Sequence, residues 1–355
     1  MKGFRKIIYP FAPDQSGAVS VLYELGGIIV ICDAGGCTGN ICGFDEPRWT
    51  KKKSKIFSAG LRDMDAILGR DDMMIKKIID VTKMMDASFI ALIGTPVPAT
   101  IGTDLDAIAK MIEKEINIFV LSINTNGASL YDDGISKAYL ELFKKFGKDV
   151  SSEKNDVVGV IGASLLDATT SKEFDKMIRR IEDKENTKVW LYSIDTDNHP
   201  FEDIENAACA SKNIVVAPSG IEAAKYLKER YGIEYEIYYP MPKESELFDD
   251  LNISKDILNH KRILIIHQQV YANSLREAII SCINDTKIDV ATWFMMDDDI
   301  KLENDIHLYD EDQFISLADN NNYDVIIGDE TFKKALKNFK GTYVNLPHFA
   351  VSGVW

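Results

Sequence analysis

Three cysteines near the N-terminus are the residues with the clearest capacity for chemistry. Cys32, Cys37 and Cys42 follow one another at equal steps of five residues, inside a glycine-rich segment, residues 26–49. Thiolates bind iron-sulfur clusters and other soft metals when several of them converge. Five residues along an α-helix rotate a side chain by roughly 140°, and an odd step along a strand reverses its face. We therefore expect an apolar strand followed by a glycine-rich loop, since glycine allows turns that bring the thiols together.

This segment has three interpretations. It is a metal or iron-sulfur site, or a set of inert packed cysteines, or a phosphate cradle, because a strand followed by a glycine-rich loop also binds nucleotides. The sequence has neither a GxGxxG motif nor the P-loop lysine motif. Three thiols are one fewer than the four that a cubane cluster usually takes. The fourth ligand would be a non-cysteine group, an exogenous ligand or a thiol from another chain.

The other candidate residues favour structural roles. Cys209 and Cys282 are predicted to lie within helices beside apolar residues, and free cysteine is most often a small buried hydrophobe. The five histidines are scattered and show no metal-binding spacing. His267 directly follows a predicted strand, where α/β sheets bind ligands, although we favour a structural role. The acidic run at residues 297–299 is predicted to be a solvated loop.

Composition limits the classes of partner. The chain has 56 acidic and 41 basic residues and a net charge of -15, which argues against nucleic acid or an anionic membrane as the main partner. No apolar stretch approaches the ~20 residues that span a bilayer, and the N-terminus lacks the features of a secretory signal. An odd number of cysteines in a long chain argues against a disulfide framework and predicts a reducing, cytoplasmic location.

Alternating strand and helix signals run through the whole chain, as in parallel α/β proteins. We expect three Rossmann-like modules, each a mainly parallel sheet flanked by helices, because 355 residues exceed one ordinary core. The expected modules are residues 1–152, which carry the cysteine segment, residues 153–258 and residues 259–355. The polar run at residues 147–156 is the predicted linker. Residues 94–102, rich in proline and glycine, are predicted to be a loop.

In order and spacing, several motifs resemble the nitrogenase component 1 family over nearly the whole chain. In that family a strand runs into His-Gly-Pro-x-Gly-Cys; here Cys-Asp-Ala-Gly-Gly-Cys stands in its place, and Cys37 is the matching cysteine. The family's Cys-Pro-x-x-x-Ile-Gly-Asp-Asp motif is similar to the stretch that begins at Thr95. Further similar segments are residues 9–18, 58–69, 217–232 and 323–328.

The chain also departs from the family pattern. The family's first cysteine is missing around residues 9–10, and Thr95 replaces its third. Cys32 and Cys42 are additions of this chain. By the resemblance, Val216 stands where the molybdenum-iron cofactor has its cysteine ligand. Reduction of dinitrogen is therefore not expected.

The resemblance implies an iron-sulfur oxidoreductase subunit. It implies a homodimer, or a heterodimer with a related subunit, whose twofold axis brings Cys37 segments together around a cluster, expected as 4Fe-4S. Electrons would come from an ATP-dependent iron-protein reductase and pass to an unidentified small-molecule substrate between the modules. Beside Cys37, the expected ligands are Cys32 and Cys42; the expected cofactor-binding residues also include Asp33, Gly36 and Thr95.

Two other classes of function remain open at this point. The first is a non-catalytic carrier or scaffold for an iron-sulfur cluster or cofactor, which the loss of two family cysteines favours. The second is a nucleotide-sugar or nucleotide-dependent enzyme on similar α/β modules, which would need the glycine segment to hold phosphate.

Overall fold

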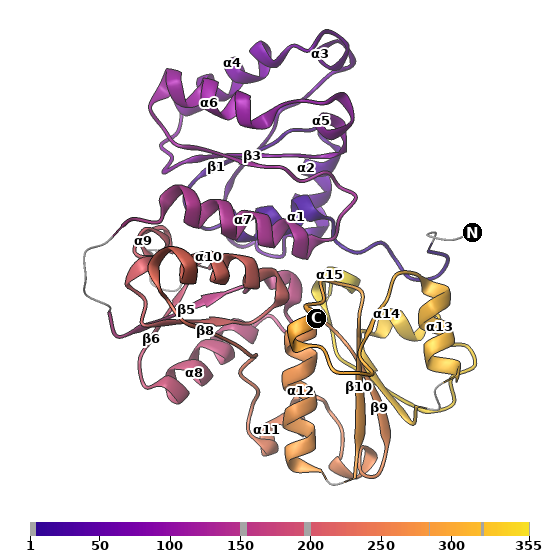
Figure 1. The fold of residues 1–355 in the computed structure, drawn as a ribbon. Coiled ribbons are helices and arrows are strands. Elements are labelled where there is room, and N and C mark those ends of the chain that lie inside the picture. Colours follow the sequence, from indigo (N-terminus) through magenta and orange to yellow (C-terminus); the bar gives the residue numbers. More distant parts are fainter. Residues whose placement is uncertain (1–4, 150–154, 195–199, 284, 321–322, 355) are drawn as a thin grey trace.

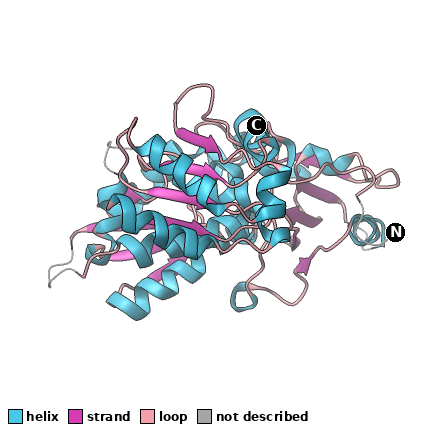
Figure 2. Ribbon diagram, turned by 90° about the horizontal axis from the view of Figure 1, so that it is seen from above, coloured by secondary structure: helices cyan, strands magenta, loops and turns pink. Residues whose placement is uncertain are grey.

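The protein folds into three parallel β-sheets, each flanked by helices, as shown by a computed structural model (Figures 1 and 2). The structure describes residues 5–149, 155–194, 200–283, 285–320 and 323–354. Every strand pair within these sheets is parallel. The predicted α/β class with three mainly parallel sheets is therefore confirmed.

The first sheet has the strand order β2-β1-β3-β4 and carries the cysteine segment. Its strands are β1 (Ile28–Ile31), β2 (Lys55–Ser58), β3 (Ile90–Ile93) and β4 (Val120–Ile123). Figure 1 shows helices on both faces, with α1 (Asp14–Leu22) and α7 (Tyr131–Phe146) on one and α3 (Asp63–Leu68), α4 (Asp71–Thr82) and α6 (Leu105–Ile116) on the other. The central strands are buried on both faces and read as continuous apolar runs, as expected for covered parallel sheets.

Helices α1 and α7 pack with their backbones almost in contact. A Cβ added to Gly17 would lie 1.7 Å from the carbonyl oxygen of Tyr131, and one added to Gly134 would lie 1.7 Å from that of Asp14. Only glycine allows this approach at either position. The close packing fixes the start of α1 against the carboxyl edge of the first sheet.

The second and third sheets repeat the architecture. Their strand orders are β6-β5-β7-β8 and β11-β10-β9-β12-β13. The strands of the second sheet are β5 (Val157–Ile161), β6 (Lys188–Leu191), β7 (Lys212–Val215) and β8 (Tyr235–Ile237). Those of the third are β9 (Arg262–Ile266), β10 (Lys287–Thr292), β11 (Ile306–His307), β12 (Val325–Gly328) and β13 (Thr342–Asn345). The helices are α8 (Glu173–Glu185), α9 (Pro200–Glu205), α10 (Ile221–Tyr231), α11 (Glu244–Asp250), α12 (Gln269–Cys282), α13 (Glu311–Asn320), α14 (Glu330–Lys333) and α15 (Phe349–Ser352).

Two predicted loops are helical instead. Residues 94–102 contain α5 (Pro96–Ile101), because a proline at the first helical position loses no intrahelical hydrogen bond and already has a helical φ. The cysteine segment forms α2 (Gly36–Asn40) and continues as a π-helical turn, η1 (Ile41–Asp45). Gly35, with φ of 114°, turns the chain into α2. Cys209 ends a 3-10 turn, η3 (Ala207–Cys209), rather than lying in an α-helix.

The strands of the three sheets span residues 28–123, 157–237 and 262–345. The bounds of the three modules stay a prediction. The boundary predicted after residue 152, and with it residues 150–154 of the predicted linker, lies outside the described residues. Within the part of the chain that the structure describes, no helix is both long and apolar enough to cross a membrane.

Candidate functional site

The cysteine segment lies at the carboxyl edge of the first sheet, where the starts of α1, α2 and α5 meet. Cys32 follows β1, Thr95 follows β3 and Thr125 follows β4. The Asp14 carboxylate accepts hydrogen bonds of 2.8 Å from the backbone amides of Asn126 and Gly127, which ties α1 to the segment after β4. The register of the parallel strands brings these segments, far apart in sequence, to one edge.

Cys32 is directed into the protein core. Its side chain continues the alternation of Ile28 and Val30 and packs with them beneath α4 and α6. The residue has no exposed surface, and burial, followed by the charge of Asp33, raises the pKa of its thiol to about 12. Cys32 therefore behaves as a small core hydrophobe in this fold.

Asp33 positions the helix that carries Cys37. Its buried carboxylate accepts hydrogen bonds from the Thr38 backbone amide at 2.8 Å, the Thr38 hydroxyl at 3.0 Å and the Ser58 hydroxyl at 2.6 Å. The carboxylate thus occupies the amino end of α2, where a phosphate would have to bind. This arrangement argues against the interpretation of the segment as a phosphate-binding site.

Cys37 is half-buried near the start of α2 and contacts the core on the α1 and α7 side of the sheet. Partial burial raises the pKa of its thiol, and the charges of Asp33 and Asp14 raise it further. A Cβ added at Gly36 or Gly39 would meet nothing within 4 Å. The surface beside Cys37 is therefore open to a partner or a ligand.

Cys42 lies in η1 and is also half-buried. Burial raises the pKa of its thiol, followed by the charges of Glu46 and Asp33. The chain beyond it is anchored by Arg48, whose Nε and Nη2 donate 2.7 Å hydrogen bonds to the two carboxylate oxygens of Glu46. Arg48 also donates to the carbonyl oxygen of Ser20 on α1 at 2.7 Å, which fixes η1 against that helix.

The structure does not bring the three thiols together. Among the described residues there is no group of three or more His, Cys, Asp or Glu side chains that could hold a metal ion. Cys32 packs on one face of the sheet and Cys37 contacts the core on the other. We expected the three thiols to converge in a loop, but the segment is helical after Gly35. A helix cannot turn back to bring its thiols to Cys32, which directly follows β1. Of these three thiols, those of Cys37 and Cys42 belong to partly exposed residues.

A second cluster of polar side chains lies inside the protein, where the three sheets approach one another. The rings of His267 and His348 stack with centroids 4.2 Å apart, and burial lowers the pKa of His267 well below its usual value. The Tyr131 hydroxyl lies 2.9 Å from His348 Nε2 and donates to Asp167 at 2.5 Å. The sequence singled out His267 alone, because its partners come from distant segments that no spacing connects.

Among the described residues, the cavity beside this junction is too small for a large cofactor. This cavity measures about 10 Å³ and is lined by Val216, Gln268 and Ser164. Val216 contributes a methyl-bearing side chain to the core, and its carbonyl oxygen accepts a hydrogen bond from Gln268 Nε2 at 2.9 Å. The residues present therefore do not fit a molybdenum-iron cofactor at Val216.

Fold and site together define a three-sheet α/β protein with surface thiols at the edge of its first sheet. The nitrogenase component 1 type oxidoreductase family matches residues 15–242, and the chain belongs to this family.

Among curated proteins, the chain is similar to the nitrogenase iron-molybdenum cofactor biosynthesis protein NifE of Clostridium pasteurianum. The two are 23% identical over 267 residues, which cover 71% of this chain and 49% of NifE. The chain thus spans about half the length of this relative.

Solved structures with a similar fold include nitrogenase Cp1 at pH 5 and at pH 6.5. The alignment with the structure at pH 5 has a TM-score of 0.70 at 15% identity, and it covers 100% of this chain and 87% of the nitrogenase chain. The alignment with the structure at pH 6.5 has a TM-score of 0.69 at 12% identity, and it covers 97% of this chain and 87% of the nitrogenase chain. At these identities the likeness concerns the fold.

Proposed function

We propose that the chain is a nitrogenase-like iron-sulfur oxidoreductase subunit that holds its cluster through Cys37. The supporting observation is the partly exposed Cys37, presented by α2 with open space beside it. Its sequence context resembles the family's cysteine motif. Cys42 is the second proposed ligand. Cys32 is left out of the ligand set, because its thiol lies in the core and could not reach the surface without displacing the end of β1.

Two chains related by a twofold axis, or a chain and a related subunit, would supply the remaining thiols. Two copies that each contribute Cys37 and Cys42 offer four thiolates, the number that a 4Fe-4S cluster takes. Exposed Phe44, which is 74% accessible, lies within η1 beside Cys42 and offers apolar surface for such a contact.

The residues of this chain would hold the ligands in place rather than perform bond chemistry. Asp33 fixes the start of α2 and thereby the direction of Cys37. Arg48 fixes the segment after Cys42 against α1. A bound cluster would accept and pass on single electrons. We propose an ATP-dependent iron-protein reductase as the electron donor and a small molecule other than dinitrogen as the acceptor, in the reducing cytoplasm.

A second candidate is a non-catalytic carrier or scaffold for a cluster or cofactor. Two observations favour it: the similarity to NifE, whose name assigns it to cofactor biosynthesis, and the cavity of only about 10 Å³ at the module junction. In this case the cluster at Cys37 would be passed to another protein rather than used for electron transfer.

Purification without oxygen tests the shared part of both candidates. Iron and acid-labile sulfide should be present in similar amounts, with visible absorption that bleaches on addition of dithionite. A colourless, iron-free protein that also fails to take up a reconstituted cluster would refute the proposal. Reduction of the cluster by an iron protein with ATP supports the oxidoreductase, whereas transfer of iron and sulfide to an apo-protein supports the carrier.

A further inference from the structure

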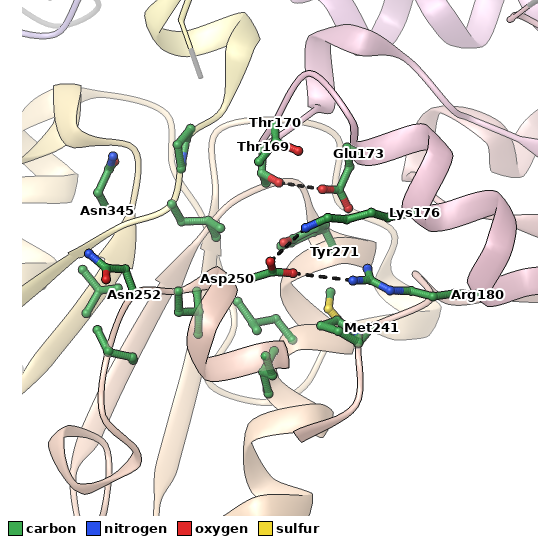
Figure 3. Close-up of a pocket in the computed structure, with 18 of the residues that line it drawn as sticks. Thr169, Thr170, Glu173, Lys176, Arg180, Met241, Asp250, Asn252, Tyr271 and Asn345 are labelled. Atoms are coloured by element: carbon green, nitrogen blue, oxygen red, sulfur yellow. Dashed lines mark hydrogen bonds and ion pairs between the residues drawn. The ribbon is translucent and has the colours of Figure 1, made fainter. Parts of the chain in front are cut away.

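A cavity of about 430 Å³ lies between the second and third modules (Figure 3). Its walls come from the start of α8, from α11 and from the residues at and after the end of β13. Parallel α/β sheets bind ligands beyond the carboxyl ends of their strands, and sites for small molecules commonly measure ≈ 300–1,000 Å³. The cavity therefore has the position and the size of a small-molecule site.

One stripe of α8 forms the charged wall of this cavity. Glu173, Lys176 and Arg180 follow one another at steps of three and four residues, which places them on one face of the helix. Figure 3 shows them in this order along the helix, with Asp250 of α11 facing the two cations.

Both acids on the walls already have partners. The Glu173 carboxylate is buried and accepts hydrogen bonds from the Tyr239 hydroxyl at 2.7 Å and the Thr169 hydroxyl at 3.0 Å. Asp250 accepts a hydrogen bond of 2.9 Å from Lys176. Neither carboxylate is therefore left to attract a cationic ligand.

Arg180, by contrast, makes long polar contacts with the residues that the structure describes. Its guanidinium lies 3.4 Å from the Pro240 carbonyl oxygen, 3.5 Å from Asp250 and 3.8 Å from Glu246, while its side chain is only 17% exposed. Charge-assisted hydrogen bonds of arginine are normally ≈ 2.7–2.9 Å long. A guanidinium withdrawn from water without a short partner is a group that an anion can satisfy.

We propose that this cavity binds a small organic anion, whose carboxylate or phosphate group pairs with Arg180 and Lys176. The rest of the lining suits an apolar body with a few polar atoms, because Leu247, Leu251 and Leu275 line the cavity together with Asn252 and Asn345. The anion competes with Asp250 for both cations.

Calorimetric titration of the full chain tests this site with simple probes. Benzoate and phenyl phosphate carry the two candidate acid groups on one apolar ring, and benzyl alcohol is their neutral counterpart. At least one anion is expected to bind with one-to-one stoichiometry and benzyl alcohol to bind more than tenfold more weakly; the tighter anion identifies the acid group. Absence of binding by both anions at millimolar concentration would overturn the proposal.

Variants locate the binding in the cavity. Arg180→Gln should weaken anion binding about tenfold or more, since a charge-assisted pair is lost. Arg179→Gln makes the same change on the neighbouring exposed residue and should alter the affinity less than twofold. Asp250→Asn should tighten binding several-fold, because it removes the competing carboxylate. Equal effects of the two arginine variants, or weaker binding to Asp250→Asn, would contradict the site.

The site is independent of the proposed cluster. The titrations apply equally to Cys37→Ser protein without iron, in which anion binding should be unchanged. Loss of iron with retained anion binding, or the reverse, therefore separates the failure of one proposal from that of the other.

Discussion

Thr95 donates a hydrogen bond of 2.7 Å from its hydroxyl to the backbone carbonyl oxygen of Cys32. The bond joins the chain just beyond β3 to the chain just beyond β1, and both residues are fully buried. Thr95 stands where the family pattern has a cysteine, and we expected it to face the cluster. Its hydroxyl instead links the ends of two neighbouring strands inside the protein.

Thr95→Val should therefore lower the free energy of unfolding by about 1–3 kcal/mol, since the Cys32 carbonyl loses its side-chain donor inside the protein. Denaturant unfolding measures this change. Thr100→Val is the matched control, because Thr100 makes a similar 2.7 Å hydrogen bond to the Pro96 carbonyl at the exposed end of α5. A loss no greater than in Thr100→Val would show that the buried bond contributes little.

Cys37→Ser should abolish the cluster in protein purified without oxygen, since a serine hydroxyl ionises far less readily than a thiol and is a poorer ligand for iron than a thiolate. Iron and sulfide analysis measures the loss. Cys282→Ser is the control, because Cys282 is also half-buried but lies at the end of α12 in the third module. Equal loss of iron from both variants would contradict the ligand assignment, as would full retention in Cys37→Ser.

Gly134→Ala should lower the free energy of unfolding by more than about 3 kcal/mol, which exceeds the usual cost of overpacking. The added methyl carbon would lie 1.7 Å from the carbonyl oxygen of Asp14, so that α1 and α7 would have to separate. Gly39→Ala in α2 meets nothing within 4 Å and should be neutral or stabilising by up to ~1 kcal/mol. Comparable stability of the two variants in thermal unfolding would argue against the close helix contact.

Asp132 should make the stability of the protein depend on pH. Burial, with a further contribution from Asp167, raises the pKa of Asp132 to about 7, while its carboxylate accepts a hydrogen bond from the Met295 amide. The folded state therefore keeps a proton that the unfolded state releases near pH ~4. Stability that Asp132 contributes in acid is lost as the pH rises from ~4 to ~7 and then stays constant.

Asp132→Asn removes this titration and can keep the bond to Met295 through its amide oxygen. Relative to the variant, the wild-type protein should lose up to about 4 kcal/mol between pH ~4 and pH ~7. Denaturant unfolding of both proteins at several pH values gives this difference in stability. The contributions of the other titrating groups are the same in both proteins and cancel. A difference that is flat with pH, or that grows in the opposite direction, would refute the assignment.

The sequence by itself determined the class of fold, and it supplied Cys37 as the proposed ligand. Alternating apolar runs and amphipathic segments are local signals, so they predicted three parallel sheets without knowledge of packing. Cys37 was proposed as a ligand from a local motif, and this assignment stays a prediction. Local rules were wrong where proline begins a helix, at Pro96, and where a single turn at Gly35 converts a glycine-rich segment into a helix.

Only the tertiary structure decided which side chains meet. It separated Cys32 from Cys37 across the first sheet, assigned Asp33 to the start of α2, and stacked His267 on His348 beside Tyr131. It also brought Arg180 and Asp250 together in a cavity that no sequence motif predicted. Such contacts depend on how whole sheets and helices pack, and that packing sums weak interactions between segments too distant in sequence to carry a common pattern.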